Sequence, residues 1–188
     1  MLFRMETAFS SDLMSDRNKK MEILKDQKTV EARIRELGAE ISEAYKDSPL
    51  TLLVIMNGGL FFGAKLAEAI NTEDFFIDSI SGSSYHHHSS TGNVQLRSAM
   101  KLDVKGRHVL ILDEVLDTGR TLKKIQEILL NQGALSVRSV VLVEKTIPRP
   151  EGVPHADWAG FLMEDRYLIG CGMDSDEKYR NLPCIAVF

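Results

Sequence analysis

The chain of 188 residues fits one globular domain better than two, because a chain of this length can already bury a substantial core. Hydrophobic residues make up 44% of the chain and charged residues 27%, a balance that argues against extensive disorder. The formal net charge of -4 gives no overall basic field for nucleic acid, and no segment approaches the roughly 18 apolar residues of a transmembrane helix.

The first 20 residues lack the continuous apolar run of a secretory signal peptide, which favours a cytoplasmic protein. The two cysteines, Cys171 and Cys184, stand in apolar surroundings without CxxC or other ligand-like spacing. Such residues in a cytoplasmic protein are typically buried and reduced. Neither cysteine is therefore a candidate nucleophile.

The first half of the chain alternates helical and strand-like patterns. Residues 29–47 carry apolar side chains at helical spacing, which predicts an amphipathic helix. Its buried face consists of Val30, Ile34, Leu37, Ile41 and Tyr45. The apolar run 50–59 predicts a buried strand that ends in a glycine turn, and 60–70 predicts a second helix. Another strand is expected at 75–81.

Residues 81–95 are rich in serine, glycine and histidine and form a long connection for a compact domain. Long loops of this kind are commonly lids or binding loops, so we expect a mobile flap. His86, His87 and His88 are consecutive, and three neighbours in an extended loop cannot all face one ion. We therefore expect a solvated loop here, not a metal site.

The second half continues the alternation. Strands are predicted at 108–112 and 137–145 with a helix at 119–133 between them, and 156–188 is expected to add short strands at the sheet edge. This order predicts an α/β fold, an open and mainly parallel twisted sheet flanked by helices on both faces. Ligands of such sheets bind beyond the carboxyl ends of the strands.

Segment 108–122 combines a phosphate-binding pattern with unusual negative charge. Asp113 and Glu114 are expected at the carboxyl end of the strand, and a loop over 115–121 leads into the helix. Backbone N–H groups at a helix start and the flexibility of Gly119 suit an anion such as phosphate. Three carboxylates would repel that anion unless they accept hydrogen bonds from sugar hydroxyls or coordinate Mg2+. A sugar that carries both phosphate and pyrophosphate reconciles the two features.

The stretch DEVLDTGRT, residues 113–121, resembles the phosphoribosyl diphosphate signature of type I phosphoribosyltransferases. The resemblance implies that Asp117 is the general acid or base that handles a proton of the purine five-membered ring. It implies that Asp113 and Glu114 accept ribose hydroxyls or hold Mg2+, although the family more often has Glu before Asp. The residues implied to bind the 5′-phosphate are Thr118, Gly119, Arg120 and Thr121.

Further stretches are similar to the 6-oxopurine, or hypoxanthine-guanine, branch of this family. They are VIMNGGLFF, SSYHHHSSTG, VVLVEKT, ADWAGFLMED and EKYRNLP, and together they span most of the chain. The first implies a pyrophosphate loop with Asn57 and Gly58, where many relatives have lysine in place of Asn57. The second implies a catalytic flap in which Ser84 and Tyr85 close over the reacting centre. The last implies that Arg180 binds pyrophosphate.

The remaining two stretches imply the purine and metal contacts. Lys145 would donate a hydrogen bond to the 6-oxo group, because lysine offers donors only. Trp158 would stack on the base, and Ala159 would read the ring edge through its backbone. Asp165 would be a further metal-binding carboxylate beside the acidic pair.

Several of these residues also have an ordinary structural alternative. Asp117 could cap the following helix, Lys145 could form a salt bridge at the sheet end, and Trp158 could belong to the core. Asp165 and Arg180 could pair with neighbouring surface charges.

The resemblance implies purine salvage, in which 5-phosphoribosyl passes from phosphoribosyl diphosphate to hypoxanthine or guanine with Mg2+, giving IMP or GMP and pyrophosphate. It implies one domain over 1–188, with a core at about 28–150 and a purine-binding hood from about 1–27 and 151–188, in a homodimer or homotetramer. Two alternatives stay open. A xanthine-guanine phosphoribosyltransferase is one, and an RNA-binding regulator on the same scaffold is the other, disfavoured by the acidic charge and by Asp117.

Overall fold

The computed structural model describes residues 20–83, 95–96 and 100–188. The predictions for Ser84, Tyr85 and His86–His88 lie outside these residues. The elements are, in chain order, β1 (Glu22–Lys25), α1 (Gln27–Ala44), β2 (Leu50–Met56), α2 (Gly59–Ala69), β3 (Phe75–Ser83), β4 (Gln95–Leu96), β5 (His108–Leu116), α3 (Arg120–Asn131), β6 (Ser136–Lys145), β7 (Trp158–Met163) and β8 (Ile185–Val187).

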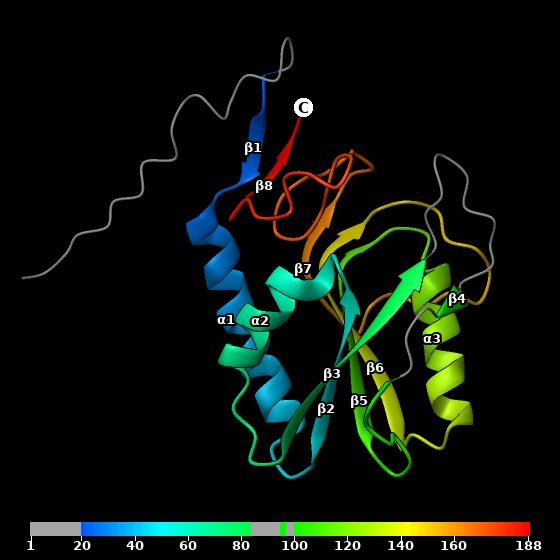
Figure 1. Cartoon of the computed structure of the whole chain (residues 1–188). Helices are drawn as coiled ribbons and strands as arrows, with labels where there is room; N and C mark the ends of the chain where they lie inside the picture. The colour runs from blue at the N-terminus through cyan, green and yellow to red at the C-terminus, as the bar shows by residue number, and fades with distance from the viewer. Residues whose placement is uncertain (1–19, 84–94, 97–99) are drawn as a thin grey trace, which may run out of the picture.

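Within the described residues, six strands form one sheet in the spatial order β4-β3-β2-β5-β6-β7 (Figure 1). The strands from β3 to β7 in this order pair in parallel, and β4 pairs antiparallel with β3. Helices α1 and α2 cover one face of the sheet and α3 covers the other. The open, mainly parallel sheet flanked by helices is therefore confirmed.

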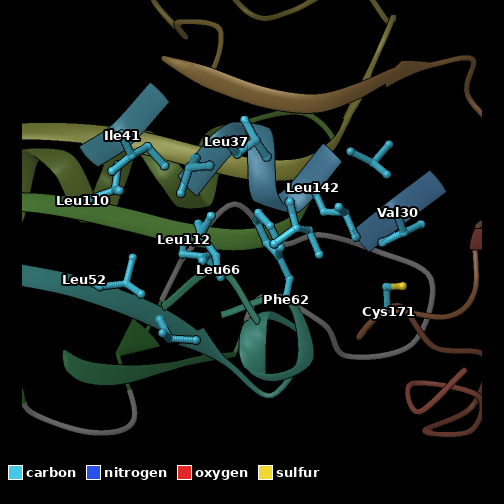
Figure 2. Close-up of a cluster of buried hydrophobic side chains, with 14 of the residues drawn as sticks. Val30, Leu37, Ile41, Leu52, Phe62, Leu66, Leu110, Leu112, Leu142 and Cys171 are labelled. Atoms are coloured by element: carbon cyan, nitrogen blue, oxygen red, sulfur yellow. The ribbon is translucent and has the colours of Figure 1, made fainter. Parts of the chain in front are cut away.

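The first helix buries the face that its sequence predicts. Asp26 is the N-cap of α1, and its carboxylate accepts a hydrogen bond from the Thr29 N–H at 2.8 Å. The buried side chains of α1 pack with those of α2 and the central strands, and Figure 2 labels part of this cluster. The helix ends at Ala44 instead of residue 47, but the Tyr45 side chain is still buried, at 4% exposure.

The central strand β5 is longer than predicted. Its parallel pairing with β6 continues through Val115 and Leu116, so the strand does not end at residue 112. The loop expected over 115–121 is reduced to 117–119, after which α3 begins. The sequence did not indicate this because two acidic residues interrupt the apolar run, whereas the strand continues as long as β6 supplies backbone partners.

The C-terminal strands are divided between two sheets. β7 joins the edge of the main sheet beside β6, as predicted, whereas β8 pairs antiparallel with β1 in a separate two-stranded sheet. Figure 1 shows this small sheet above the carboxyl ends of the parallel strands. The apolar run of β8 predicts a strand but not its partner, because β1 lies near the other end of the chain and a local pattern carries no information about so distant a segment.

Both cysteines are buried and free, as predicted. Burial raises the pKa of Cys171 to about 12 and also raises the pKa of Cys184. In the part of the chain that the structure describes, no helix combines the length and the apolar character that a bilayer crossing requires.

Candidate active site

The carboxyl ends of four parallel strands carry most of the predicted site residues. Asn57 and Gly58 follow β2, Asp117 follows β5, Lys145 ends β6, and Asp165 follows shortly after β7. Neighbouring parallel strands end at the same edge of a sheet, so residues distant in the sequence meet there. The candidate site residues therefore lie at the sheet edge where the strand order predicts a ligand site.

Asp117, Lys145 and Asp165 form a compact charged group. Lys145 Nζ lies 2.7 Å from Asp165 Oδ1 and 3.8 Å from Asp117 Oδ2. The lysine side chain is 14% exposed, whereas that of Asp117 is 39% exposed and open to a ligand. A carboxylate beside a cationic donor can accept a ring proton while the lysine donates to an oxo group. The salt-bridge alternatives for Lys145 and Asp165 are also realised, since each is the other's partner.

The turn between β5 and α3 has the backbone geometry of an anion cradle. Gly119 is the N-cap residue of α3 with φ 75°, and no side chain among the described residues caps this helix end. Asp117 is therefore not the N-cap, and the first N–H groups of α3 can bind an anion. A Cβ on Gly119 would lie 2.5 Å from Val153 Cγ1. The predicted phosphate-binding neighbours, all exposed or half-buried, are Thr118, Arg120 and Thr121.

Asp113 and Glu114 form a half-buried acidic pair near the end of β5. The Glu114 N–H donates to Asp113 Oδ1 at 3.0 Å. Loss of water around Asp113, together with the negative charge of Glu114, raises the pKa of Asp113 well above its usual value. A divalent cation would offset this repulsion, so the pair suits Mg2+. Asp165, the third predicted metal ligand, lies beside Lys145, and its role in metal binding stays a prediction. The described residues contain no group of three or more candidate ligands.

Two glycines bring the predicted pyrophosphate loop against the acidic pair. A Cβ on Gly58 would overlap the Glu114 carboxylate, and a Cβ on Gly172 would overlap the Gly58 carbonyl oxygen. The contact between Gly172 and Gly58 joins two backbones at a distance that only glycine permits. Asn57 is exposed next to this contact, and the Met56–Asn57 peptide is cis.

Arg180 lies beside the same loop but is engaged by protein groups. Its Nη1 donates to the Gly172 carbonyl at 2.8 Å, and its Nη2 lies 2.7 Å from Asp174 Oδ1 and 3.0 Å from Glu177 Oε2. The surface-charge alternative for Arg180 is thus realised. The sequence analysis did not identify Asp174 or Gly172. Both contact Arg180 only because the chain reverses direction between them and Arg180, and no local pattern indicates this reversal.

The structure does not bring Trp158 and Ala159 to this cluster. They are the first residues of β7, whereas Lys145 stands opposite Met163, its last residue. At about 3.3 Å per residue, Trp158 is about 16 Å from that end of the strand. Its ring packs against Tyr45, with centroids 6.2 Å apart, and joins the larger hydrophobic cluster. The stacking prediction for Trp158 is corrected to its core alternative.

Tyr167 is a better-placed aromatic residue that sequence reasoning missed. It follows Asp165 by two residues, and its side chain is 68% exposed, whereas the neighbouring Leu168 is buried. A large exposed ring close in the chain to the partner of Lys145 can stack on a flat base. The available signal was an aromatic residue directly after the charged stretch that follows β7.

Comparison with known proteins gives concordant results. Residues 20–176 match the model of the phosphoribosyl transferase domain family. The hypoxanthine-guanine-xanthine phosphoribosyltransferase of Tritrichomonas foetus is 35% identical over 167 residues, which cover 88% of this chain and 90% of that protein. The hypoxanthine phosphoribosyltransferase of Escherichia coli strain K12 is 33% identical over 170 residues, which cover 88% of this chain and 93% of that protein.

Solved structures agree with these sequence relatives. A crystal structure of a hypoxanthine phosphoribosyltransferase from Staphylococcus aureus superposes with a TM-score of 0.83 at 33% identity, covering 89% of this chain and 90% of that one. A hypoxanthine-guanine-xanthine phosphoribosyltransferase structure superposes with a TM-score of 0.80 at 31% identity, covering 89% of this chain and 96% of that one. The chain therefore belongs to the phosphoribosyltransferase family, in its hypoxanthine-guanine branch.

Proposed function

We propose that this protein is a purine salvage enzyme that transfers 5-phosphoribosyl from phosphoribosyl diphosphate to hypoxanthine or guanine, giving IMP or GMP and pyrophosphate. The observation that carries the proposal is the approach of Lys145 Nζ to Asp117 Oδ2 at 3.8 Å, directly beside the anion cradle of α3. This arrangement offers a hydrogen-bond donor for a 6-oxo group and an acceptor for a ring proton. The hypoxanthine-guanine relatives support the same substrate class.

The donor sugar would be held at both of its charged ends. The N–H groups at the start of α3 and the hydroxyls of Thr118 and Thr121 would bind the 5′-phosphate, because a helix N-terminus favours an anion. At the other end, the backbone at Asn57 and Gly58 and the guanidinium of Arg180 would bind pyrophosphate. Arg180 would then exchange carboxylate partners for phosphate oxygens, to which its planar group is equally suited.

Mg2+ would be held by Asp113 and Glu114 together with the donor's own oxygens. The raised pKa of Asp113 supports this assignment, since burial and the negative charge of Glu114 both disfavour its ionised form and a bound cation would favour it. When bound, the ion would neutralise charge on the departing pyrophosphate. Glu114 lies against Gly58, so the acidic pair and the pyrophosphate loop would serve the same part of the donor.

In the transfer step, the bond between C1′ and a pyrophosphate oxygen breaks as a bond from C1′ to a purine ring nitrogen forms. The purine loses a ring proton, which the Asp117 carboxylate accepts, and pyrophosphate leaves with the electrons of the broken bond. Lys145 orients the base through its 6-oxo oxygen and disfavours the 6-amino group of adenine. We assign base stacking to Tyr167, on the strength of its 68% exposure near Asp165.

The test is to incubate the protein with Mg2+, phosphoribosyl diphosphate and each of hypoxanthine, guanine, xanthine and adenine, and to measure nucleotide and pyrophosphate. Formation of IMP or GMP with little AMP is expected, and omission of Mg2+ should abolish turnover. Absence of IMP and GMP across a range of protein and donor concentrations would reject the proposal. Xanthine is included because the Tritrichomonas foetus relative carries xanthine in its name.

We further propose a cytoplasmic location and assembly as a homodimer or homotetramer, without nucleic-acid or membrane partners. The acidic net charge of -4 supports the absence of a nucleic-acid partner. Sedimentation of the purified protein would give the oligomeric state, and a monomer at micromolar concentration would contradict this part.

A further inference from the structure

Two buried charged residues lie next to the turn between β5 and α3, which carries Asp117. The side chains of Glu144 and Arg149 are only 4% and 7% exposed, and Arg149 Nη2 lies 2.7 Å from Glu144 Oε1. His155 Nδ1 pairs with the same oxygen, and the Ala156 N–H donates to the other carboxylate oxygen at 3.2 Å. The Glu144 carboxylate therefore anchors the whole connection between β6 and β7.

The same arginine reaches the turn that follows β5. Arg149 Nη1 donates to the main-chain carbonyl of Asp117 at 3.1 Å. A Cβ on Gly119 would lie 3.3 Å from this nitrogen and 2.5 Å from Val153 Cγ1, so the connection packs tightly against the turn. One planar guanidinium thus connects the end of β6 to the backbone that carries Asp117. A lysine lacks the planar fork of donors that makes both contacts at once.

We propose that Arg149 and Glu144 are positioning residues for the transfer reaction, acting through the main chain of Asp117. The proposal rests on the proposed function, in which Asp117 accepts a proton from a base that Lys145 orients. Glu144 directly precedes Lys145 in β6. The ion pair between Glu144 and Arg149 therefore fixes Asp117 and Lys145 relative to each other. In this role neither Glu144 nor Arg149 touches the substrate.

The energetics separate this role from a merely structural one. A buried ion pair has a large desolvation cost, so removing one partner strands a charge and destabilises the fold, whereas replacing both by neutral side chains is often neutral for stability. The hydrogen bond to the Asp117 carbonyl has no such replacement, because its donor is the guanidinium, which methionine lacks. A double neutral variant should therefore recover stability without recovering catalysis.

The experiment compares Arg149→Met, Glu144→Gln and the double variant with the wild-type protein, measuring kcat, KM for both substrates and the thermal midpoint. Arg149→Met should lower kcat by about 100-fold, the loss expected from misplacing a catalytic group by about 1 Å. The double variant should regain most of the thermal midpoint while its kcat stays low. Recovery of kcat together with the midpoint, or a wild-type kcat in Arg149→Met, would overturn the proposal.

Arg33→Met is the control, because Arg33 also joins carboxylates to main-chain carbonyls of another segment, with a side chain that is 25% exposed against 7% for Arg149. Its Nη1 pairs with Glu36 and Glu40, both at 2.9 Å, while its Nε and Nη2 donate to the carbonyls of Gly160 and Ala159, both at 3.1 Å. This variant should lose stability and keep both kcat and KM. A kcat loss equal to that of Arg149→Met would show that any broken bridge has this effect.

Amide hydrogen exchange tests the role of Arg149 without depending on enzyme turnover. The amides of residues 117–121 should exchange faster in Arg149→Met than in the wild-type protein and remain unchanged in Arg33→Met. If the wild-type protein made no nucleotide, the proposed function would fail while exchange would still decide whether Arg149 holds the turn. Equal exchange rates in all three proteins would refute that role.

Discussion

Replacing Gly119 by alanine should weaken both the fold and the binding of phosphoribosyl diphosphate. Gly119 has φ 75°, a left-handed conformation that an L side chain adopts at a cost of about 1–2 kcal/mol. The new methyl group would also meet Val153 Cγ1 at 2.5 Å, and overpacking of this kind costs typically about 1–3 kcal/mol. The free energy of unfolding should therefore fall by about 2–5 kcal/mol.

Gly106→Ala separates the two contributions. Gly106 has φ 71°, and its added Cβ would meet no described atom within 4 Å, so this variant should bear the backbone cost alone. The two variants should differ by about 1–3 kcal/mol, which corresponds to about 2–12 °C in thermal midpoint for a chain of this size.

Donor binding supplies the second measurement. If the turn moves to accommodate the methyl group, at least one charge-assisted hydrogen bond to the 5′-phosphate weakens, at about 1.5–3 kcal/mol. KM for phosphoribosyl diphosphate should then rise by about tenfold or more in Gly119→Ala and stay unchanged in Gly106→Ala. Equal midpoints for the two variants together with an unchanged KM would refute the reasoning on both counts.

Four further predictions concern the site and the core. Asp117→Asn keeps the side-chain shape but not its basicity, so kcat should fall by about 100- to 10,000-fold while calorimetry still detects donor binding; an unchanged rate would remove Asp117 as the proton acceptor. Tyr167→Leu should raise KM for hypoxanthine, whereas Trp158→Leu should lower the thermal midpoint and leave that KM unaltered, and the opposite pattern would restore Trp158 as the stacking residue. Because burial raises the pKa of Cys171 from 9.0 to about 12, an aromatic disulfide reagent at about pH 8 should modify both buried thiols slowly before unfolding and rapidly after it. The unfolded thiol loses its proton first, so stability should decline as the pH rises from 9.0 towards 12, and Cys171→Ala should make this decline shallower.

Local sequence patterns were sufficient to predict the central parallel strands, the buried face of α1 and the anion cradle. The helical spacing from Val30 to Ile41 identified the buried face of α1, and the apolar runs identified the central parallel strands. The stretch 113–121 indicated the anion cradle because its chemistry is contained in consecutive residues. In each of these cases the physical determinant lies within a few residues of the chain.

Features that depend on contacts between distant segments could not be predicted from the sequence. Trp158 was assigned to the base because the stretch ADWAGFLMED resembles the purine-stacking segment of the family, but a strand pattern does not reveal which end of β7 lies at the site. The register with β6 places Trp158 at the opposite end. The sequence likewise gave no sign that Glu144 and Arg149 form a buried pair against the Asp117 carbonyl. A lone acid after an apolar run resembles a solvated strand end until its partner is known.

The segment after β7 links the two halves of the proposed reaction. It carries Asp165, the partner of Lys145, and the exposed ring of Tyr167, and it then returns to Gly172, which packs against the carbonyl of Gly58. The groups assigned to the base and those assigned to pyrophosphate are therefore joined by one short stretch of chain. Since Gly172 has φ 104° and no space for a side chain, displacing it would move the pyrophosphate loop and the base-facing residues together. A defect in donor binding and a defect in base binding should accordingly arise from the same substitution at Gly172, whereas a site built from independent loops would separate them.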